Sequence, residues 1–223
     1  MKEPIVYIVS SKTCFSDEEI ALISRYLPDS RIKKADKYLR PIDRNNCIIS
    51  YFLLLYGLIK NFGIKSIPKT DVGEFGRPFF IENDIYFSIS HCSSGVCCGI
   101  AGQNIGTDIE NINVHFSDII DIVMSEREIR RINCSASPYT EFTKLWTLKE
   151  SICKFYATGI DDNLKSLDFF NVDGDTFSHS GLMFRAEIKE DYCLSACTKD
   201  TAPVFIAKTP KQYLDDFFKL YTL

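Results

Sequence analysis

The sequence predicts an α+β protein of two related lobes, each a small, mostly antiparallel sheet packed on a long helix. Two apolar helical patterns, over residues 41–63 and 138–159, carry this prediction together with the strand patterns on either side of each. Residues 102–106 mark the seam between the two sets of elements. We therefore expect an N-terminal lobe of residues 1–103 and a C-terminal lobe of residues 104–223.

The first lobe is expected to open with a strand over residues 5–9, followed by a short helix that Asp17 caps and that runs through Tyr26. The helix over residues 41–63 is apolar around most of its circumference, so it should be a central core element. Residues 85–90 alternate between apolar and polar side chains, and residues 96–101 return as a second strand. The two runs predict a β-hairpin.

The second lobe is expected to start with a strand over residues 107–112. Ser117 can cap a helix that runs to about Ile132, and Pro138 or Thr140 opens the second long helix. After this helix the chain returns to strand patterns, over residues 169–172, 182–188, 192–197 and 204–207.

Charge and hydropathy exclude several classes of protein. The net charge of -4 and the pI near 5.5 argue against a nucleic-acid partner, which usually requires a basic surface. The segment after Met1 has neither a basic region nor a small-residue cleavage site, and no apolar run reaches the roughly 18 residues of a membrane span. We therefore expect a cytoplasmic protein without a membrane partner.

The nine cysteines are an odd number and scatter through the predicted helices and strands, so we expect free thiols. The three histidines and the absence of a CxxC motif argue against a zinc site. Residues 31–44 are strongly basic in this acidic chain. Such a segment is either a solvated helix face or a phosphate-binding surface, and charge alone leaves both readings open.

Asp108 and Glu110 alternate with Ile109 in a predicted strand, so the two carboxylates project from one face. Carboxylates about 6.6 Å apart along a strand can converge on one hard cation such as Mg²⁺. The alternative is an ordinary polar strand face.

Trp146, Glu150 and Lys154 recur every four residues and share one face of the second long helix. Apolar residues such as Leu145 and Leu148 flank this stripe, which favours a position at the boundary between the lobes. The alternative is a solvated Glu–Lys pair on the surface.

Two shorter motifs precede these carboxylates. Gly76-Arg77-Pro78 is a rigid turn that presents a guanidinium, which can bind phosphate in bidentate fashion. Phe87-Ser88-Ile89-Ser90-His91 ends a strand with a histidine, which is either structural or functional.

In this order the four motifs resemble the signature of the 4'-phosphopantetheinyl transferase superfamily. That signature has a Gly-Lys/Arg-Pro turn, a Phe-Asn-x-Ser-His strand, a Gly-x-Asp-x-Glu strand and a Trp-x-x-Lys-Glu-x-x-x-Lys helix. The chain has Gly76-Arg77-Pro78, Phe87-Ser88-Ile89-Ser90-His91, Gly106-Thr107-Asp108-Ile109-Glu110, and Trp146-Thr147-Leu148-Lys149-Glu150 followed by Lys154. Its length resembles that of the long, single-chain Sfp type.

The resemblance implies the fold of that superfamily, two pseudo-symmetric lobes with coenzyme A and a metal ion at their interface. Asp108, Glu110 and Glu150 would hold Mg²⁺, or Mn²⁺ in its place. Coenzyme A would be bound by Arg31, Lys34, Arg77, Pro78, Ser90, His91, Asp108 and Lys154. Within this set, Arg31 and Lys34 fall where the Sfp type places lysines for the 3'-phosphate.

The resemblance also implies the reaction. A serine hydroxyl of an apo acyl or peptidyl carrier protein would attack the β-phosphorus of coenzyme A, and 3',5'-ADP would leave. Glu150, directly or through a metal-bound water, would be the base, and Lys154 would stabilise charge on the departing phosphate. A chain of this length should act as a monomer, because only the shorter relatives need to assemble to form the interface.

Two other functions remain open on the sequence alone. One is a catalytically silent module that binds coenzyme A or a carrier protein, and the other is a metal-dependent phosphohydrolase. The chain also departs from the motifs, since Ser88 replaces an asparagine, and Asn46 and Cys47 stand where an arginine and a threonine are expected.

A partly helical apolar pattern lies between the metal strand and the second long helix. Related enzymes dock the carrier's helix beside this region, and their carriers are typically acidic with an apolar helix face. We therefore expect either a docking surface or residues that pack into the second lobe. The residues concerned are Val114, Phe116, Ile119, Ile120 and Val123.

Overall fold

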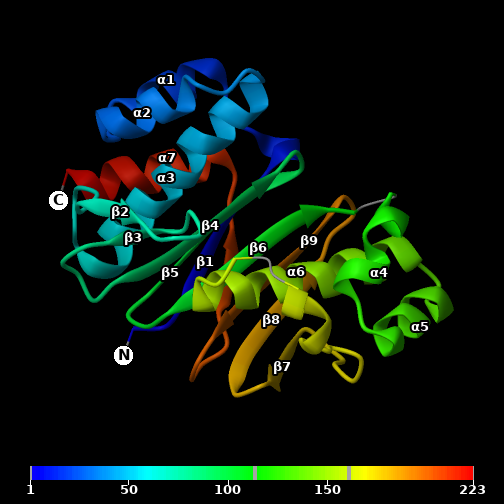
Figure 1. Cartoon of the computed structure of the whole chain (residues 1–223). Coiled ribbons are helices and arrows are strands. Elements are labelled where there is room, and N and C mark those ends of the chain that lie inside the picture. The colour runs from blue at the N-terminus through cyan, green and yellow to red at the C-terminus, as the bar shows by residue number, and fades with distance from the viewer. Residues whose placement is uncertain (1, 113–114, 160–161, 223) are drawn as a thin grey trace.

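The computed structural model describes residues 2–112, 115–159 and 162–222 (Figure 1). They form an α+β protein with two four-stranded sheets and one two-stranded sheet, as predicted. The α-helices are α1 (Asp17–Ser24), α2 (Asp29–Ala35), α3 (Pro41–Phe62), α4 (Ile120–Val123), α5 (Glu126–Cys134), α6 (Pro138–Tyr156) and α7 (Pro210–Tyr221). The strands are β1 (Ile5–Ser10), β2 (Thr70–Val72), β3 (Pro78–Phe80), β4 (Tyr86–Cys92), β5 (Gly95–Ala101), β6 (Ile105–Asn111), β7 (Thr176–His179), β8 (Leu182–Ile188), β9 (Tyr192–Thr198) and β10 (Val204–Ala207). Short 3₁₀ helices are η1 (Ser11–Thr13), η2 (Phe116–Asp118) and η3 (Asp162–Ser166).

The two four-stranded sheets repeat one arrangement. In the first, β1 pairs antiparallel with β5, and β5 pairs antiparallel with β4. In the second, β6 pairs antiparallel with β9, and β9 pairs antiparallel with β8. Each repeat is thus a strand, a long helix and a hairpin whose last strand returns to the first. The repetition agrees with the predicted relationship between the lobes.

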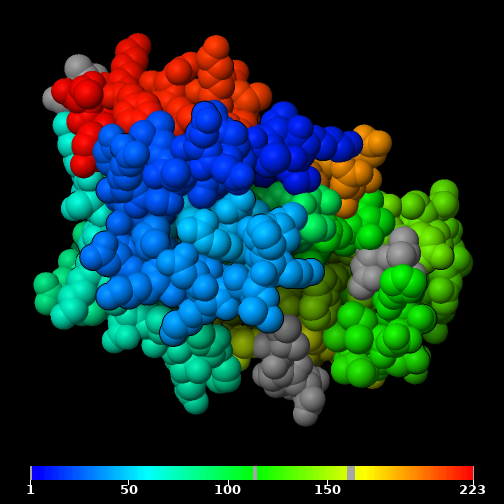
Figure 2. Space-filling view, turned by 90° about the horizontal axis from the view of Figure 1, so that it is seen from above, coloured from blue at the N-terminus to red at the C-terminus, as the bar shows by residue number. Residues whose placement is uncertain are grey.

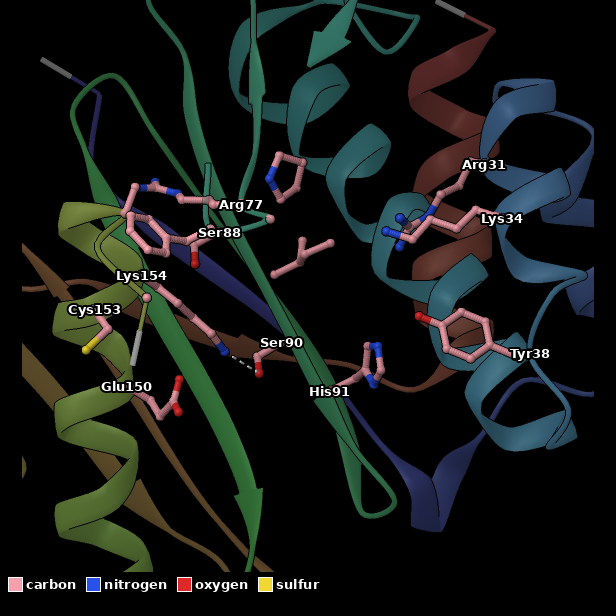
Figure 3. A pocket seen from close by; sticks show the side chains of 16 residues that line it. Arg31, Lys34, Tyr38, Arg77, Ser88, Ser90, His91, Glu150, Cys153 and Lys154 are labelled. Carbon is pink, nitrogen blue, oxygen red and sulfur yellow. Dashed lines mark hydrogen bonds between the residues drawn. The ribbon is translucent and has the colours of Figure 1, made fainter. Parts of the chain in front are cut away.

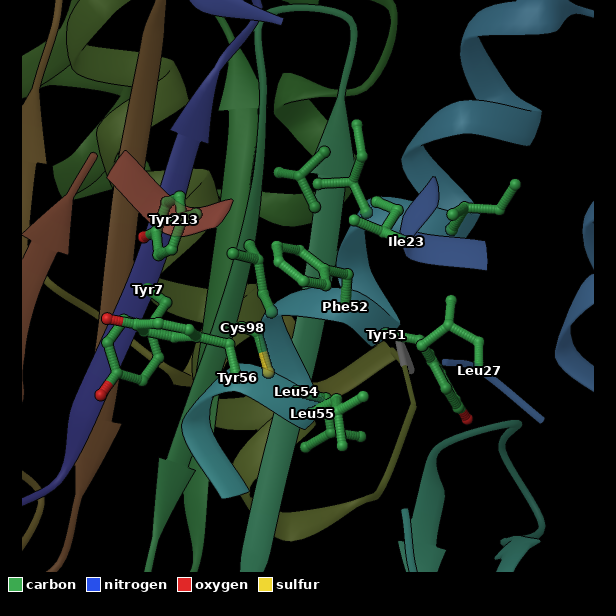
Figure 4. Close-up of a cluster of buried hydrophobic side chains, with 14 of the residues drawn as sticks. Tyr7, Ile23, Leu27, Tyr51, Phe52, Leu54, Leu55, Tyr56, Cys98 and Tyr213 are labelled. Atoms are coloured by element: carbon green, nitrogen blue, oxygen red, sulfur yellow. The ribbon is translucent and has the colours of Figure 1, made fainter. Parts of the chain in front are cut away.

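Helix α3 forms the core of the first lobe, because every residue from Asn46 to Ile59 is buried. It begins with Pro41 and stops at Gly63, whose φ of 71° is a left-handed conformation that glycine adopts without strain. Figure 4 shows the aromatic part of this core. The ring of Tyr56 lies 5.0 Å from the rings of Tyr7 and Tyr213, edge to face in both pairs.

The C-terminal segment packs on the first lobe, although residues 104–223 were expected to form the second. Strand β10 pairs in parallel with β1. The ring centroid of Phe217 in α7 lies 5.2 Å from that of Phe52 in α3. Figure 2 shows this red segment beside the blue N-terminal helices. Helix α7 was not predicted, although Thr209, Pro210 and Gln212 form a capping box and an N-terminal proline at its start. The parallel strand pair has no local turn that would reveal it in the sequence.

Three predicted elements differ from the structure. The expected helix from Ser117 to Ile132 is divided into η2, α4 and α5, because Ser125 forms a new capping box with Glu128. Residues 169–172 form no strand, and β7 lies seven residues later. Ser16 caps α1 in place of Asp17, which is the first helical residue.

The two lobes meet where β4 and β6 run alongside one another (Figure 1). Ser88 of β4 accepts a hydrogen bond of 3.1 Å from the backbone nitrogen of Thr107 in β6. Behind this contact, Ile105 and Ile109 of β6 join an apolar cluster with Val6 of β1. The seam therefore brings the motif on β4 next to the carboxylate motif on β6.

The nine cysteines are free, which confirms the prediction of unpaired thiols. Most of them are buried and pack as small apolar side chains. None of the helices in the described part of the chain is long and apolar enough to cross a membrane.

Gly106→Ala should lower the free energy of unfolding by about 3 kcal/mol, the upper range for overpacking. A Cβ at residue 106 would overlap the carbonyl oxygen of Ser151 and lie 2.6 Å from the nitrogen of Phe155, both in the backbone of α6. Urea unfolding should reveal the loss. Gly102→Ala is the matched control, because a Cβ there meets no atom within 4 Å. Equal stabilities of the two variants would show that β6 and α6 are not held this closely.

Candidate active site

A cavity of about 600 Å³ opens between the lobes. Figure 3 shows side chains of α2 and of the segment before α3 on one side, α6 on the other and β4 between them. The predicted site residues that line the cavity are Arg31, Lys34, Arg77, Pro78, Ser90, His91, Glu150 and Lys154. Asp108 and Glu110 are not among the lining residues.

Lys154 links the elements that meet at the seam. Its Nζ lies 2.6 Å from Oδ1 of Asp108 and donates a hydrogen bond of 2.9 Å to Oγ of Ser90. Ser90 in turn donates a hydrogen bond of 2.7 Å to the same carboxylate oxygen. Burial disfavours the charge on Lys154, but the nearby Asp108 carboxylate keeps the pKa of this lysine above its ordinary value. The triangle joins α6, β4 and β6 at one point.

The three predicted metal ligands share one electrostatic environment. Burial and the charge of Asp108 raise the pKa of Glu150 to about 7. Burial, Asp108 and Glu150 also raise the pKa of Glu110 above its ordinary value. Because carboxylates that repel one another retain protons, the raised pKa values indicate that a cation would be stabilised here.

The donor set fits a divalent cation, although the side chains do not form a finished metal site. Oδ2 of Asp108 is buried and has no hydrogen-bond partner, so this oxygen is available as a ligand. Oxygen donors are the ligands that Mg²⁺ prefers. Within the described ranges, however, no three His, Cys, Asp or Glu side chains are grouped closely enough to hold a metal. Binding would therefore require the carboxylates to draw together.

The opposite wall of the cavity is cationic. Arg31 is 7% exposed, and its Nε and Nη2 donate to the carbonyl oxygen of Cys47 and the hydroxyl of Ser50, each at 3.1 Å. Lys34 lies one helical turn further along α2 and is exposed. Burial lowers the pKa of His91, and the charges of Arg31 and Lys154 lower it further. A wall of this kind suits a ligand that carries several phosphates.

The family model described as the 4'-phosphopantetheinyl transferase superfamily matches residues 104–207, the segment that includes Asp108, Glu110, Glu150 and Lys154. This segment is just under half of the chain, and it resembles the 4'-phosphopantetheinyl transferase superfamily.

Individual members of the superfamily resemble the chain over part of their length. It is 30% identical over 130 residues to the 4'-phosphopantetheinyl transferase gsp of Aneurinibacillus migulanus, covering 56% of this chain and 53% of the relative. It is 31% identical over 141 residues to the L-aminoadipate-semialdehyde dehydrogenase-phosphopantetheinyl transferase of Saccharomyces cerevisiae, covering 57% and 52%. Enterobactin synthase component D of Escherichia coli K12 is 27% identical over 151 residues, covering 64% and 71%. The matches thus span about half the length of the first two relatives.

The departures from the superfamily motifs have defined places in the structure. Ser88 is 3% exposed and accepts the Thr107 amide described above, so its short side chain serves the contact between the lobes. Asn46 donates to the carbonyl oxygen of Cys92 at 3.0 Å and so holds α3 to the end of β4. Cys47 is buried.

The region predicted to dock a carrier in this superfamily packs mostly into the second lobe. The ring of Phe116 stacks on Phe142 with centroids 4.6 Å apart, and Val123 is buried. Ile119 and Ile120 are partly buried against the same core, and Val114 lies outside the described residues. Among the described residues of this region, Ile122 is a large apolar side chain that is exposed, at 63%.

Sequence reasoning missed a buried ion pair formed by the first lysine of the helix motif, Lys149. Nζ of Lys149 lies 2.8 Å from Oε2 of Glu128, and both side chains are fully buried. Lys149 also donates to the carbonyl oxygen of Leu164, while Glu128 accepts from the nitrogen of Phe169. A lysine between apolar helix positions was the available signal, but it does not identify its partner.

Proposed function

We propose that the chain is a 4'-phosphopantetheinyl transferase of the Sfp type. It transfers the 4'-phosphopantetheine group from coenzyme A to a serine of an apo acyl or peptidyl carrier protein and releases 3',5'-ADP. The observation that carries the proposal is the cavity at the seam, where the cationic wall of the first lobe faces Glu150 and Lys154 of the second. The family-model match over residues 104–207 and the names of the relatives support the reaction type.

The donor binds with its phosphates against the cationic wall. Arg31, Lys34 and His91 bind the nucleotide end, and Lys154 meets the pyrophosphate. Asp108, Glu110 and Glu150 would hold Mg²⁺, or Mn²⁺ in its place. Bound there, the metal would neutralise charge on the pyrophosphate.

Glu150 is the proposed base. Its pKa of about 7 leaves a large fraction of carboxylate at neutral pH that can accept the proton of the carrier's serine, directly or through water. The serine oxygen forms a bond to the β-phosphorus while the bond from that phosphorus to the 3',5'-ADP oxygen breaks. Lys154 stabilises the charge that develops on the leaving phosphate.

The chain itself contains both halves of the site, so we propose that it acts as a monomer. We also propose that it works in the cytoplasm, where coenzyme A and reduced thiols coexist. Nucleic acid and membranes are not part of the proposed function.

The deciding experiment is incubation of the protein with coenzyme A, Mg²⁺ and a panel of apo carriers from fatty-acid, polyketide and peptide-synthetase systems. Intact-protein mass spectrometry should show the mass of one phosphopantetheine added to a carrier, and chelation should stop the gain until Mg²⁺ or Mn²⁺ is restored. Release of free phosphopantetheine without a carrier would instead identify a phosphohydrolase. Binding of coenzyme A without any transfer would identify a silent binding module.

Ile122→Asp should raise the KM for the carrier about tenfold, because it removes an exposed apolar contact and introduces repulsion against an acidic partner. The Kd for coenzyme A should be unchanged. Ile188→Asp is the matched control, since Ile188 is 48% exposed at the end of β8 in another part of the lobe. Equal KM values for the two variants would place the carrier elsewhere.

A further inference from the structure

Arg77 lies in the turn of a short hairpin, formed by β2 and β3, at the edge of the cavity. The turn between β2 and β3 closes where the nitrogen of Gly73 donates to the carbonyl oxygen of Arg77 at 2.9 Å, and Gly76 takes a φ of 81°. Because Pro78 follows directly, the backbone on the far side of the turn is also restricted. The hairpin therefore holds the base of the Arg77 side chain in one place, and Figure 3 shows the side chain near Lys154.

The guanidinium of Arg77 spans both lobes. Its Nη1 donates to the carbonyl oxygen of Phe155 in α6 at 3.0 Å. Its Nη2 donates to the carbonyl oxygens of Phe87 in β4 at 3.3 Å and Ile105 in β6 at 3.0 Å, and to Oδ1 of Asn104 at 2.9 Å. Asn104 closes the group, since its Nδ2 also donates to the Phe155 carbonyl oxygen. One side chain thus ties together the three elements that form the seam.

These contacts occupy Arg77 with neutral acceptors. No carboxylate in the described ranges pairs with it, and its Nε is buried without a hydrogen-bond partner. Burial lowers the pKa of Arg77, although an arginine remains charged. Both terminal nitrogens are engaged by these four acceptors, and the single N–H of Nε cannot form the two parallel bonds of bidentate phosphate binding.

Each backbone acceptor lies in an element that carries a residue of the site. Phe155 follows Lys154, Phe87 precedes Ser88, and Ile105 opens the strand that carries Asp108. Phe155 is also in the last turn of α6, where a positive charge stabilises the helix end. A shift of the Arg77 contacts would therefore move Lys154 relative to Ser90 and Asp108.

We propose that Arg77 is a positioning residue that sets the spacing between the lobes, and with it the contacts of Lys154, and that it does not bind the phosphates of coenzyme A. The inference rests on the proposed transfer reaction at this site. It replaces the phosphate-binding role that the sequence motif suggested for this arginine.

The kinetics of Arg77→Ala and Arg77→Lys distinguish the two roles. We expect Arg77→Ala to lower kcat by about tenfold to a hundredfold, the range for a small misplacement of catalytic groups. The Kd for coenzyme A should change less than about threefold. Arg77→Lys should recover part of kcat, since an ammonium can still donate to several of the carbonyl oxygens. A Kd raised about tenfold or more with kcat unchanged at saturation would overturn the proposal.

A donor substrate that lacks the 3'-phosphate provides a second test of the role of Arg77. For a positioning role, 3'-dephospho-coenzyme A should show the same fold loss in Arg77→Ala as coenzyme A does. If Arg77 held the 3'-phosphate, the loss would disappear with the truncated donor, and the proposal would fail.

Arg131→Ala is the matched control. Arg131 also donates to backbone carbonyl oxygens, those of Phe170 and Val172 at 2.7 and 2.8 Å, but it does so within the second lobe and away from the seam. It should lower the melting temperature while leaving kcat of the folded protein near the wild-type value. A loss of kcat equal to that of Arg77→Ala would mean that stability alone explains both effects.

Hydrogen exchange separates a failure of this inference from a failure of the proposed function. In Arg77→Ala, the amide of Thr107 and the amides of the last turn of α6 should exchange faster than in the wild type, whether or not the protein transfers phosphopantetheine. Unchanged exchange at both places would overturn the positioning role even in an active enzyme.

Discussion

Asp108→Asn should reduce the rate of phosphopantetheine transfer by about a hundredfold or more, as expected when a preorganised charge is removed from a site of phosphoryl transfer. Asp108 is 1% exposed, and the amide has the same size and can still accept from Ser90. The substitution therefore removes the charge that pairs with Lys154 and would bind the metal, with little change in packing. The rate of mass gain of an apo carrier measures the loss.

The same variant should also bind Mn²⁺ more weakly, which can be followed by titration without any carrier. Glu187→Gln is the control, because Glu187 is a carboxylate on β8 that pairs with Arg185 and Lys189 instead of Lys154. Its transfer rate should stay near that of the wild type. An Asp108→Asn rate within about threefold of the wild type would contradict the assignment of Asp108 to the metal and to Lys154.

Lys149→Met should lower the free energy of unfolding by about 3 to 5 kcal/mol, the usual result of removing one member of a buried ion pair. The methionine fills a similar volume, but Glu128 would keep its charge in a site where neither side chain is exposed. The loss should appear as a lower midpoint in urea unfolding. The contact of the lysine with the Leu164 carbonyl oxygen would be lost at the same time.

A surface pair provides the comparison for this measurement. Nζ of Lys12 lies 2.7 Å from Glu190, the same kind of contact, but the two side chains are 53% and 83% exposed. Lys12→Met should leave the unfolding midpoint almost unchanged, because water screens an exposed pair. Similar midpoints for Lys149→Met and Lys12→Met would show that the Glu128 pair is not desolvated in solution.

Much of the fold could be predicted because it depends on patterns among residues that are close together in the sequence. The apolar residues of α3 recur at helical spacing, and its stop at Gly63 is a local property of the backbone. The hairpin of β4 and β5 is likewise set by alternation and a tight turn. The prediction of one helix from Ser117 was wrong, although it also used a short-range pattern. The apolar pattern continues across Ser125, where a capping box starts a new helix.

In the candidate site, too, the relations within one helix or strand could be predicted, whereas the contacts between elements could not. By itself, the sequence determined that Asp108 and Glu110 alternate with the core residue Ile109, and that Glu150 and Lys154 share one helix face, because both relations depend on the geometry of a single element. Their resemblance to known motifs then suggested the chemistry.

Only the tertiary structure decided how those elements meet. It paired Lys154 with Asp108 and Ser90, directed Arg77 to the carbonyl oxygens of three elements, and brought β10 back beside β1. These contacts join residues that are far apart in the chain, and they follow from how two sheets and their helices bury apolar surface together. Spacing along the sequence carries no information on that packing, so the partners of a polar side chain at the seam appear only when both lobes are in place.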